Sequence, residues 1–189
     1  MSFVNSQLFN DVQLAEVFAD SKMFADAIPY QSWQVACDRY QQIGPLKGEE
    51  LHAFVMTHFT FADQTLPSAK LDSLSVKQYI ADLWPHLHRA ADTNESSSLL
   101  PLNYDYIVPG GRFQEIYYWD SYFTALGLED IGDLATIEAM VNNFIDLQNR
   151  IGCIPNGNRS YYSSRSQPPV LALMIHMLWQ AKYRQNADF

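Results

Sequence analysis

Two loops in this sequence gather side chains that could bind a small polar ligand. The first is PGGRFQEIYYWDSY at residues 109–122, and the second is IPNGNRSYYSSRSQPP at residues 154–169. Both combine glycine turns with arginine, aromatic and carboxylate or amide side chains. A neutral sugar needs this mixture, because its hydroxyls donate and accept hydrogen bonds while its C–H faces pack on aromatic rings. We interpret the two loops as a candidate sugar-binding surface and expect them to meet in the folded chain.

Each candidate residue also has a purely structural interpretation. Asp120 could cap the helix that follows it, and Trp119 could belong to the core. Asn156 lies in a stretch rich in glycine and asparagine, which is typical of a turn. Arg112 and Arg165, each taken alone, are typical surface residues. The interpretation as a binding site therefore depends on the combination of residues and not on any one of them.

The first loop contains two acids that could take part in acid–base chemistry. A glycosidase that inverts its substrate needs two carboxyl groups roughly 6.5–9.5 Å apart, and one that retains configuration needs them about 5 Å apart. Glu115 and Asp120 are five residues apart in a loop, and this spacing alone leaves both arrangements open.

Composition narrows the class of ligand. The chain has 189 residues and a net charge of −9, which argues against nucleic acid and against anionic membrane surfaces as partners. The longest apolar run, residues 170–179, is too short to cross a bilayer. The five histidines show no metal-ligand spacing, so we expect no metal and no other cofactor. We interpret the negative charge mainly as a source of solubility.

The N-terminal sequence and the cysteines indicate in which cellular compartment the protein lies. The N-terminus has neither a basic region nor an apolar stretch of the kind found in signal peptides. Cys37 and Cys153 match no disulfide or metal spacing and are typical of free thiols in a reducing compartment. We therefore expect a cytoplasmic location, or a periplasmic one if a leader has been removed.

The elements that must position the loops are mainly helical. Apolar residues recur at helical spacing over 32–43 and 49–59, and Ser75 with Gln78 forms a capping box that opens a third helix. Further helices are expected over 119–128, from Asp133 onward, and after Pro168-Pro169. The last is apolar nearly all round, which predicts burial on both sides. Residues 104–108 look extended. With about seven helices and no strand pair, the fold class is all-α.

The motifs resemble a known family. PGGRFQEIYYWDSYF is similar to the first signature of the trehalases, which reads Pro-Gly-Gly-Arg-Phe, any residue, Glu, any, Tyr, any, Trp-Asp, and every fixed position is present. The stretch at 154–169 is also trehalase-like. Upstream, LFNDVQLAEVFADSKMFADAIP at 8–29 and LWPHLHR at 83–89 resemble weaker stretches of the same family. The resemblance covers nearly the whole chain.

The resemblance implies an α,α-trehalase, a glycosidase that hydrolyses α,α-trehalose to two glucose molecules with inversion. It implies an (α/α)6 toroid, a helical barrel of six inner and six outer helices, of which this chain would be an incomplete, N-terminal part. Residues 1–189 would belong to one catalytic domain, with 1–30 an extension that packs on the barrel. The positions that match the family's sugar contacts are Arg112, Trp119, Asp120, Asn156, Arg165, Ser166 and Gln167.

The same resemblance places the catalytic Asp and Glu downstream of Phe189. We therefore expect no catalytic pair within this chain and no activity of the chain alone. We also expect apolar surface to be exposed where neighbouring helices are missing, especially along residues 170–179, and self-association through it. Two other interpretations stay open. One is a carbohydrate-binding module without chemistry, and the other is a small helical remnant of a decayed gene.

Overall fold

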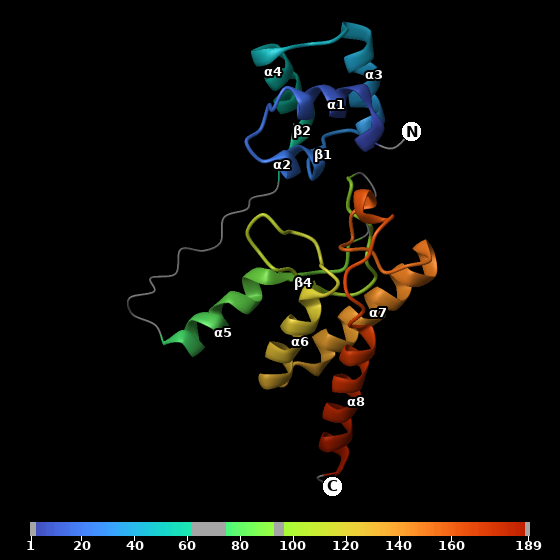
Figure 1. The fold of residues 1–189 in the computed structure, drawn as a ribbon. Coiled ribbons are helices and arrows are strands. Elements are labelled where there is room, and N and C mark those ends of the chain that lie inside the picture. Colours follow the sequence, from blue (N-terminus) through green and yellow to red (C-terminus); the bar gives the residue numbers. More distant parts are fainter. Residues whose placement is uncertain (1–2, 62–74, 93–96, 188–189) are drawn as a thin grey trace. The chain divides into compact units, whose positions relative to one another are not determined.

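The computed structural model of the chain describes residues 3–61, 75–92 and 97–187. The chain divides into two compact units, one of residues 1–63 and 94–100 and the other of residues 64–93 and 101–189. We call them unit 1 and unit 2 and describe each by itself (Figure 1). None of the helices in the described ranges is long and apolar enough to cross a membrane.

Unit 1 is built from short helices and one two-stranded pair. In chain order its elements are η1 (Phe3–Asn5), α1 (Gln7–Leu14), α2 (Ser21–Ala25), β1 (Ile28–Pro29), α3 (Trp33–Ile43), α4 (Gly48–His58) and β2 (Phe59–Thr60). The strands run antiparallel, with Pro29 opposite Phe59. Serine caps set two of the helix starts: the hydroxyl of Ser6 accepts from Phe9 N–H, and that of Ser32 accepts from Val35 N–H. These caps satisfy backbone donors that a helix start leaves free.

An aromatic core holds unit 1 together. Phe24 lies 5.3 Å from Phe3 and 5.2 Å from Phe59 between ring centroids, and all three rings are buried. The hydroxyl of Tyr40 on α3 donates to Asp11 on α1 at 2.6 Å. Residues 3–30 therefore contribute to one core with α3 and α4. Their packing on a barrel stays a prediction.

Unit 2 carries the two candidate loops. Its elements are α5 (Val76–Leu87), β3 (His88–Arg89), β4 (Tyr106–Ile107), α6 (Asp120–Asp130), α7 (Leu134–Ile151), η3 (Ser160–Tyr162) and α8 (Leu171–Ala187). Strands β3 and β4 pair antiparallel, with Arg89 opposite Tyr106. Helix α7 packs on both α6 and α8, and its residues Ile137, Met140, Phe144 and Leu147 are fully buried. Helices α6, α7 and α8 form the core of unit 2, and both candidate loops connect directly to them (Figure 1).

Several local predictions are confirmed. The described residues are mainly helical, and residues 106–107 are extended. Asp133 caps α7 by accepting from Thr136 N–H at 3.1 Å. Ser75 caps α5 by accepting from Gln78 N–H at 3.2 Å, but the Gln78 side chain donates to Asp82. The structure therefore contains the serine bond of the expected capping box, while the Gln78 side chain bonds to Asp82 instead.

Three predictions are wrong. The described residues contain eight α-helices and not seven. They also contain two strand pairs where none was expected, because strands of two residues are too short to show an alternating pattern. Helix α8 is not buried on both sides, since Leu173, Ile175, Trp179 and Tyr183 are 43–63% exposed. Apolar composition predicted the helix, but α6 and α7 cover only one of its faces.

Candidate functional site

The two candidate loops are joined along their backbones. Tyr117 and Gly157 form an antiparallel bridge, and Tyr118 N–H donates to Asn156 C=O at 2.9 Å. The amide oxygen of Asn158, which is fully buried, accepts from Ile116 N–H at 2.9 Å. The prediction that the loops meet is therefore confirmed.

Gly157 is what allows this close approach. A Cβ at this position would lie 2.8 Å from the carbonyl oxygen of Ile116 and 3.4 Å from Cγ of Glu115. The first distance is shorter than van der Waals contact allows, so any side chain here would force the loops apart. Glycine lets the two backbones lie directly against each other.

A buried ion pair lies beneath the junction. Nε of Arg159 is 3.1 Å from Oε2 of Glu115, and the two side chains are 6% and 0% exposed. Two charges removed from water in this way are stable only while they compensate each other. Glu115 is therefore engaged in holding the second loop against the first, and it faces no solvent-filled space.

A row of aromatic rings connects the two arginines that the sequence singled out. Phe113, Tyr117 and Tyr162 follow one another with centroid distances of 5.4 and 5.8 Å. The guanidinium of Arg112 lies 5.5 Å from the Phe113 ring, and that of Arg165 lies 4.9 Å from the Tyr162 ring. Both arginines are exposed. Cation–π contacts of this kind hold a guanidinium over the face of an aromatic ring.

The phenol of Tyr117 is held neutral. The Tyr117 and Tyr162 hydroxyls are 3.1 Å apart. Burial, followed by hydrogen bonds to Glu115 and to Tyr162, raises the pKa of Tyr117 well above its ordinary value. Tyr117 therefore stays protonated at any physiological pH and links the buried carboxylate to the ring that carries Arg165.

The start of α6 holds the next two candidates. The backbone N–H of Trp119 donates to Oε1 of Gln167 at 3.0 Å, which ties the end of the second loop to the helix. Trp119 occupies the N-cap position, and its side chain is 42% exposed. It is thus no core residue. Its ring meets Phe123 edge to face at 5.4 Å.

Asp120 is the first residue of α6 and does not cap it. The helix start has no side-chain capping bond, so the capping interpretation fails. Asp120 is half-buried. The structure therefore presents a hydrogen-bond acceptor beside the exposed indole of Trp119.

Asn156 lies between the two tied segments. Its N–H donates to Arg165 C=O at 3.1 Å, while its own carbonyl accepts from Tyr118. Among the described residues, its side-chain oxygen is buried and accepts no hydrogen bond. A buried acceptor without a partner calls for a donor from outside the chain, such as a hydroxyl or a water.

The backbone thus brings Trp119, Asn156, Arg165 and Gln167 together, with Asp120 next along the chain. The remaining two candidates are less fixed. Arg112 joins them through the aromatic row, and Ser166 is exposed, its hydroxyl donating to Gln167 C=O at 3.3 Å. Sequence reasoning missed Arg159 and Gly157, although both lie inside the second motif.

Comparisons with known proteins agree on the relationship. The family model described as Trehalase matches residues 3–187. The periplasmic trehalases of Shigella flexneri serotype 5b and of Escherichia coli strain SMS-3-5 are each 47% identical over 174 residues. These 174 residues are 92% of this chain and 31% of each relative. The chain therefore spans about a third of the length of the curated relatives it matches.

A solved structure is also similar. The neutral trehalase of Saccharomyces cerevisiae is 28% identical, and the match covers 95% of this chain and 34% of that one. The TM-score is 0.42, which is too low to assign the fold by itself. The family match and the sequence identity to the bacterial relatives are what place this chain.

Proposed function

Because the chain belongs to the trehalase family, we propose that its joined loops form one side of the sugar site of an α,α-trehalase. The whole enzyme would hydrolyse α,α-trehalose to two glucose molecules with inversion. The observation that carries the proposal is the junction itself, which gathers Trp119, Asn156, Arg165 and Gln167 through backbone hydrogen bonds.

Each side chain has a proposed role that fits its surroundings. Arg112 and Arg165 would donate to sugar hydroxyls from the two ends of the aromatic row. Asp120 would accept from hydroxyls, and the exposed face of Trp119 would pack against the ring C–H groups.

The amide residues complete the proposed site. The buried oxygen of Asn156, which lacks a donor among the described residues, would receive one from the sugar. Gln167 already uses Oε1 to accept from Trp119 N–H, which leaves its NH2 group to donate. Ser166 would offer a hydroxyl at the exposed rim.

The chemistry itself would come from elsewhere in the enzyme. Inversion needs one carboxyl group to protonate the leaving oxygen and a second to activate water on the opposite face. Glu115 is buried and ion-paired, so it is unsuited to either task. Asp120, at the start of α6, would accept hydrogen bonds from sugar hydroxyls, whereas an acid catalyst must donate a proton to the leaving oxygen. The catalytic Asp and Glu would lie in the part of the family's domain beyond this chain.

The relatives support proposals about the location and the complete fold of the enzyme. The bacterial relatives are described as periplasmic, so we propose a periplasmic location in preference to the cytoplasmic one expected from composition. We also propose that α5 to α8 form part of the helical toroid that the family resemblance implies. The substrate would be the disaccharide, with no cofactor.

Titrating the chain with trehalose and following its amide resonances by NMR tests the proposed site. We expect the largest changes in residues 117–120, 156–158 and 165–167. Loss of a charged acceptor weakens binding by about 10- to 150-fold, so Asp120→Asn should abolish a weak interaction. The matched control, Glu138→Gln on the exposed face of α7, should bind as the unchanged chain does. Equal binding by Asp120→Asn would refute the role of Asp120.

A glucose-release assay on the same sample separates sugar binding from chemistry. We expect no glucose, because each missing acid–base group is worth about 10²–10⁴-fold in rate. Turnover that Asp120→Asn abolishes, with folding intact, would show that Asp120 is a catalytic residue and not a binding one.

A further inference from the structure

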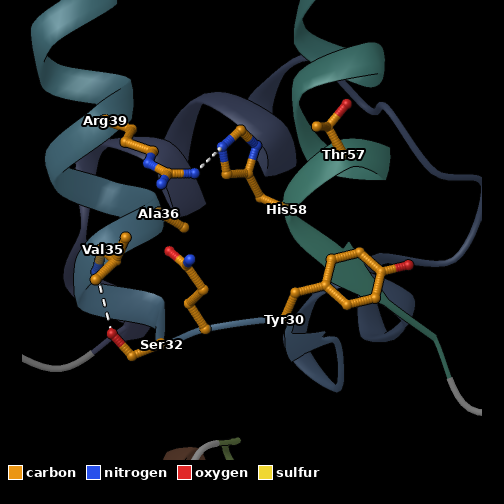
Figure 2. Close-up of a pocket in the computed structure, with 8 residues that line it drawn as sticks. Tyr30, Ser32, Val35, Ala36, Arg39, Thr57 and His58 are labelled. Atoms are coloured by element: carbon orange, nitrogen blue, oxygen red, sulfur yellow. Dashed lines mark hydrogen bonds between the residues drawn. The ribbon is translucent and has the colours of Figure 1, made fainter.

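Unit 1 contains a pocket that the proposed sugar site does not use. It has a volume of about 150 Å³ and lies between the N-terminal half of α3 and the C-terminal end of α4. Figure 2 shows Arg39 on α3 and His58 on α4 facing each other across its upper end, with Val35 and Ala36 along the α3 side. Tyr30 and Gln31, which follow β1, complete the lining.

Arg39 lacks a counter-ion in this pocket. Among the described residues, the polar contact of its side chain is to Nε2 of His58, at 3.4 Å from Nη1. The acid next to it, Asp38, accepts from Gln34 on the outer face of the helix. The guanidinium of Arg39 is exposed, and its planar fork of N–H donors matches the geometry of a carboxylate or phosphate group.

His58 is held in one tautomer. Its Nδ1 lies 2.8 Å from the carbonyl oxygen of Phe54, so Nδ1 carries the hydrogen and Nε2 is the acceptor that receives Arg39. The ring also stacks on Phe54 at 4.1 Å, and the carbonyl of His58 accepts from Tyr30 N–H. Nε2 is therefore fixed in orientation and points toward Arg39 (Figure 2).

We propose that this pocket binds a small oxyanion, carried as a phosphate or carboxylate group, between Arg39 and His58. The guanidinium would donate two parallel N–H bonds to it. His58, once protonated at Nε2, would donate a third from the opposite side. The start of α3, which has no acid in its first turn, adds the positive end of a helix dipole. The oxyanion would supply the negative charge that lets the two cations lie so close together.

The proposal predicts a pH dependence with a definite sign. The titratable groups that line the pocket are Arg39 from α3, His58 from α4 and the phenol of Tyr30. Protonation of His58 at Nε2 would add a hydrogen-bond donor and a positive charge that face the anion. Binding should be stronger at the lower pH, where the imidazole is protonated.

NMR titration of the full chain with sodium sulfate and, separately, with sodium acetate tests this. Both ions keep their charge between pH 5.5 and pH 8, so only the protein titrates. Sulfate represents the tetrahedral phosphate source and acetate the planar carboxylate source. We expect saturable shifts of the His58 ring signals that are at least several-fold tighter at pH 5.5 than at pH 8.

Variants separate specific binding from a general effect of salt. Arg39→Gln should weaken binding by about tenfold or more, and His58→Gln should remove the pH dependence. Lys47→Gln, which removes an exposed cation outside the pocket, should bind as the unchanged chain does. Saturation by sulfate alone would identify a phosphate-like ligand, and saturation by acetate would identify a carboxylate. Linear, unsaturable shifts with both ions, or equal binding by Arg39→Gln, would overturn the proposal.

Discussion

Removing the buried carboxylate beneath the loop junction should cost more stability than any surface change in unit 2. Glu115→Ala leaves Arg159, whose side chain is 6% exposed, as an uncompensated charge in the interior. Breaking one partner of a buried pair in this way costs about 3–5 kcal/mol. Glu115→Gln keeps the shape and one acceptor oxygen but loses the charge, for which we expect about 1.5–3 kcal/mol.

Urea unfolding followed by circular dichroism measures both changes. The midpoint should fall without a change in slope if the folded state keeps its compactness. The exposed pair of Glu138 and Lys182, 2.7 Å apart with both side chains over 40% exposed, is the matched control. Glu138→Ala should cost no more than about 1 kcal/mol, because exposed pairs are screened by solvent.

A double variant distinguishes a missing charge from a missing shape. Replacing Glu115 and Arg159 together with leucine and methionine leaves no buried charge, so it should recover most of the loss. The reasoning is refuted if Glu115→Ala costs no more than Glu138→Ala. It is also refuted if the double variant is as unstable as the sum of its two single changes.

Three further expectations concern other parts of the chain. Gly157→Ala should cost about 1–3 kcal/mol, seen as a lower midpoint in thermal unfolding, because its Cβ would lie 2.8 Å from Ile116 O; an unchanged midpoint would contradict the close approach. The exposed apolar face of α8 should cause the chain to self-associate, which sedimentation velocity measures. Trp179→Gln, which changes a residue 60% exposed, should weaken this self-association. A chain that stays monomeric at high concentration would contradict the expectation. Burial, together with a hydrogen bond to Asp11, raises the pKa of Tyr40 to about 12, so the folded state favours the protonated phenol. The contribution of Tyr40 to the free energy of unfolding should therefore be intact below pH 10 and fall by about 1.4 kcal/mol per pH unit above it. Tyr40→Phe should reduce this dependence on pH, measured by urea unfolding from pH 9 to 11.5. An unchanged dependence would show that Tyr40 does not cause it.

Local signals in the sequence predicted local structure well. Ser75 and Asp133 were recognisable as caps, because a serine or aspartate just before an apolar helical pattern can accept from a backbone N–H of the first turn. The mixed composition of the two loops correctly indicated that they meet. Their residues could be assigned to a sugar site only through the family resemblance.

Contacts between residues far apart in the sequence could not be predicted. Glu115 and Arg159 are 44 residues apart, and nothing in the sequence distinguishes this buried arginine from exposed Arg165 six positions later. Exposed apolar surface was expected along residues 170–179, and the exposed side chains of Leu173, Ile175 and Trp179 confirm it. The pattern of apolar residues could not show which face of the helix stays uncovered, because it does not say where a neighbour packs. The pairing of Arg39 with His58 likewise depends on two helices whose relative placement no local pattern gives.

The loop junction also constrains the order in which unit 2 can fold. Ile116 and Asn158 are bonded across 42 residues, and the intervening segment contains all of α6 and α7. Closing so long a loop is slow unless the helices between its ends have already formed and paired. The junction should therefore form after the α6–α7 hairpin, so that the binding surface exists only in chains that have nearly finished folding. A sugar that binds at the junction would stabilise a contact that forms only in the last step of folding. It would therefore slow unfolding much more than it speeds refolding.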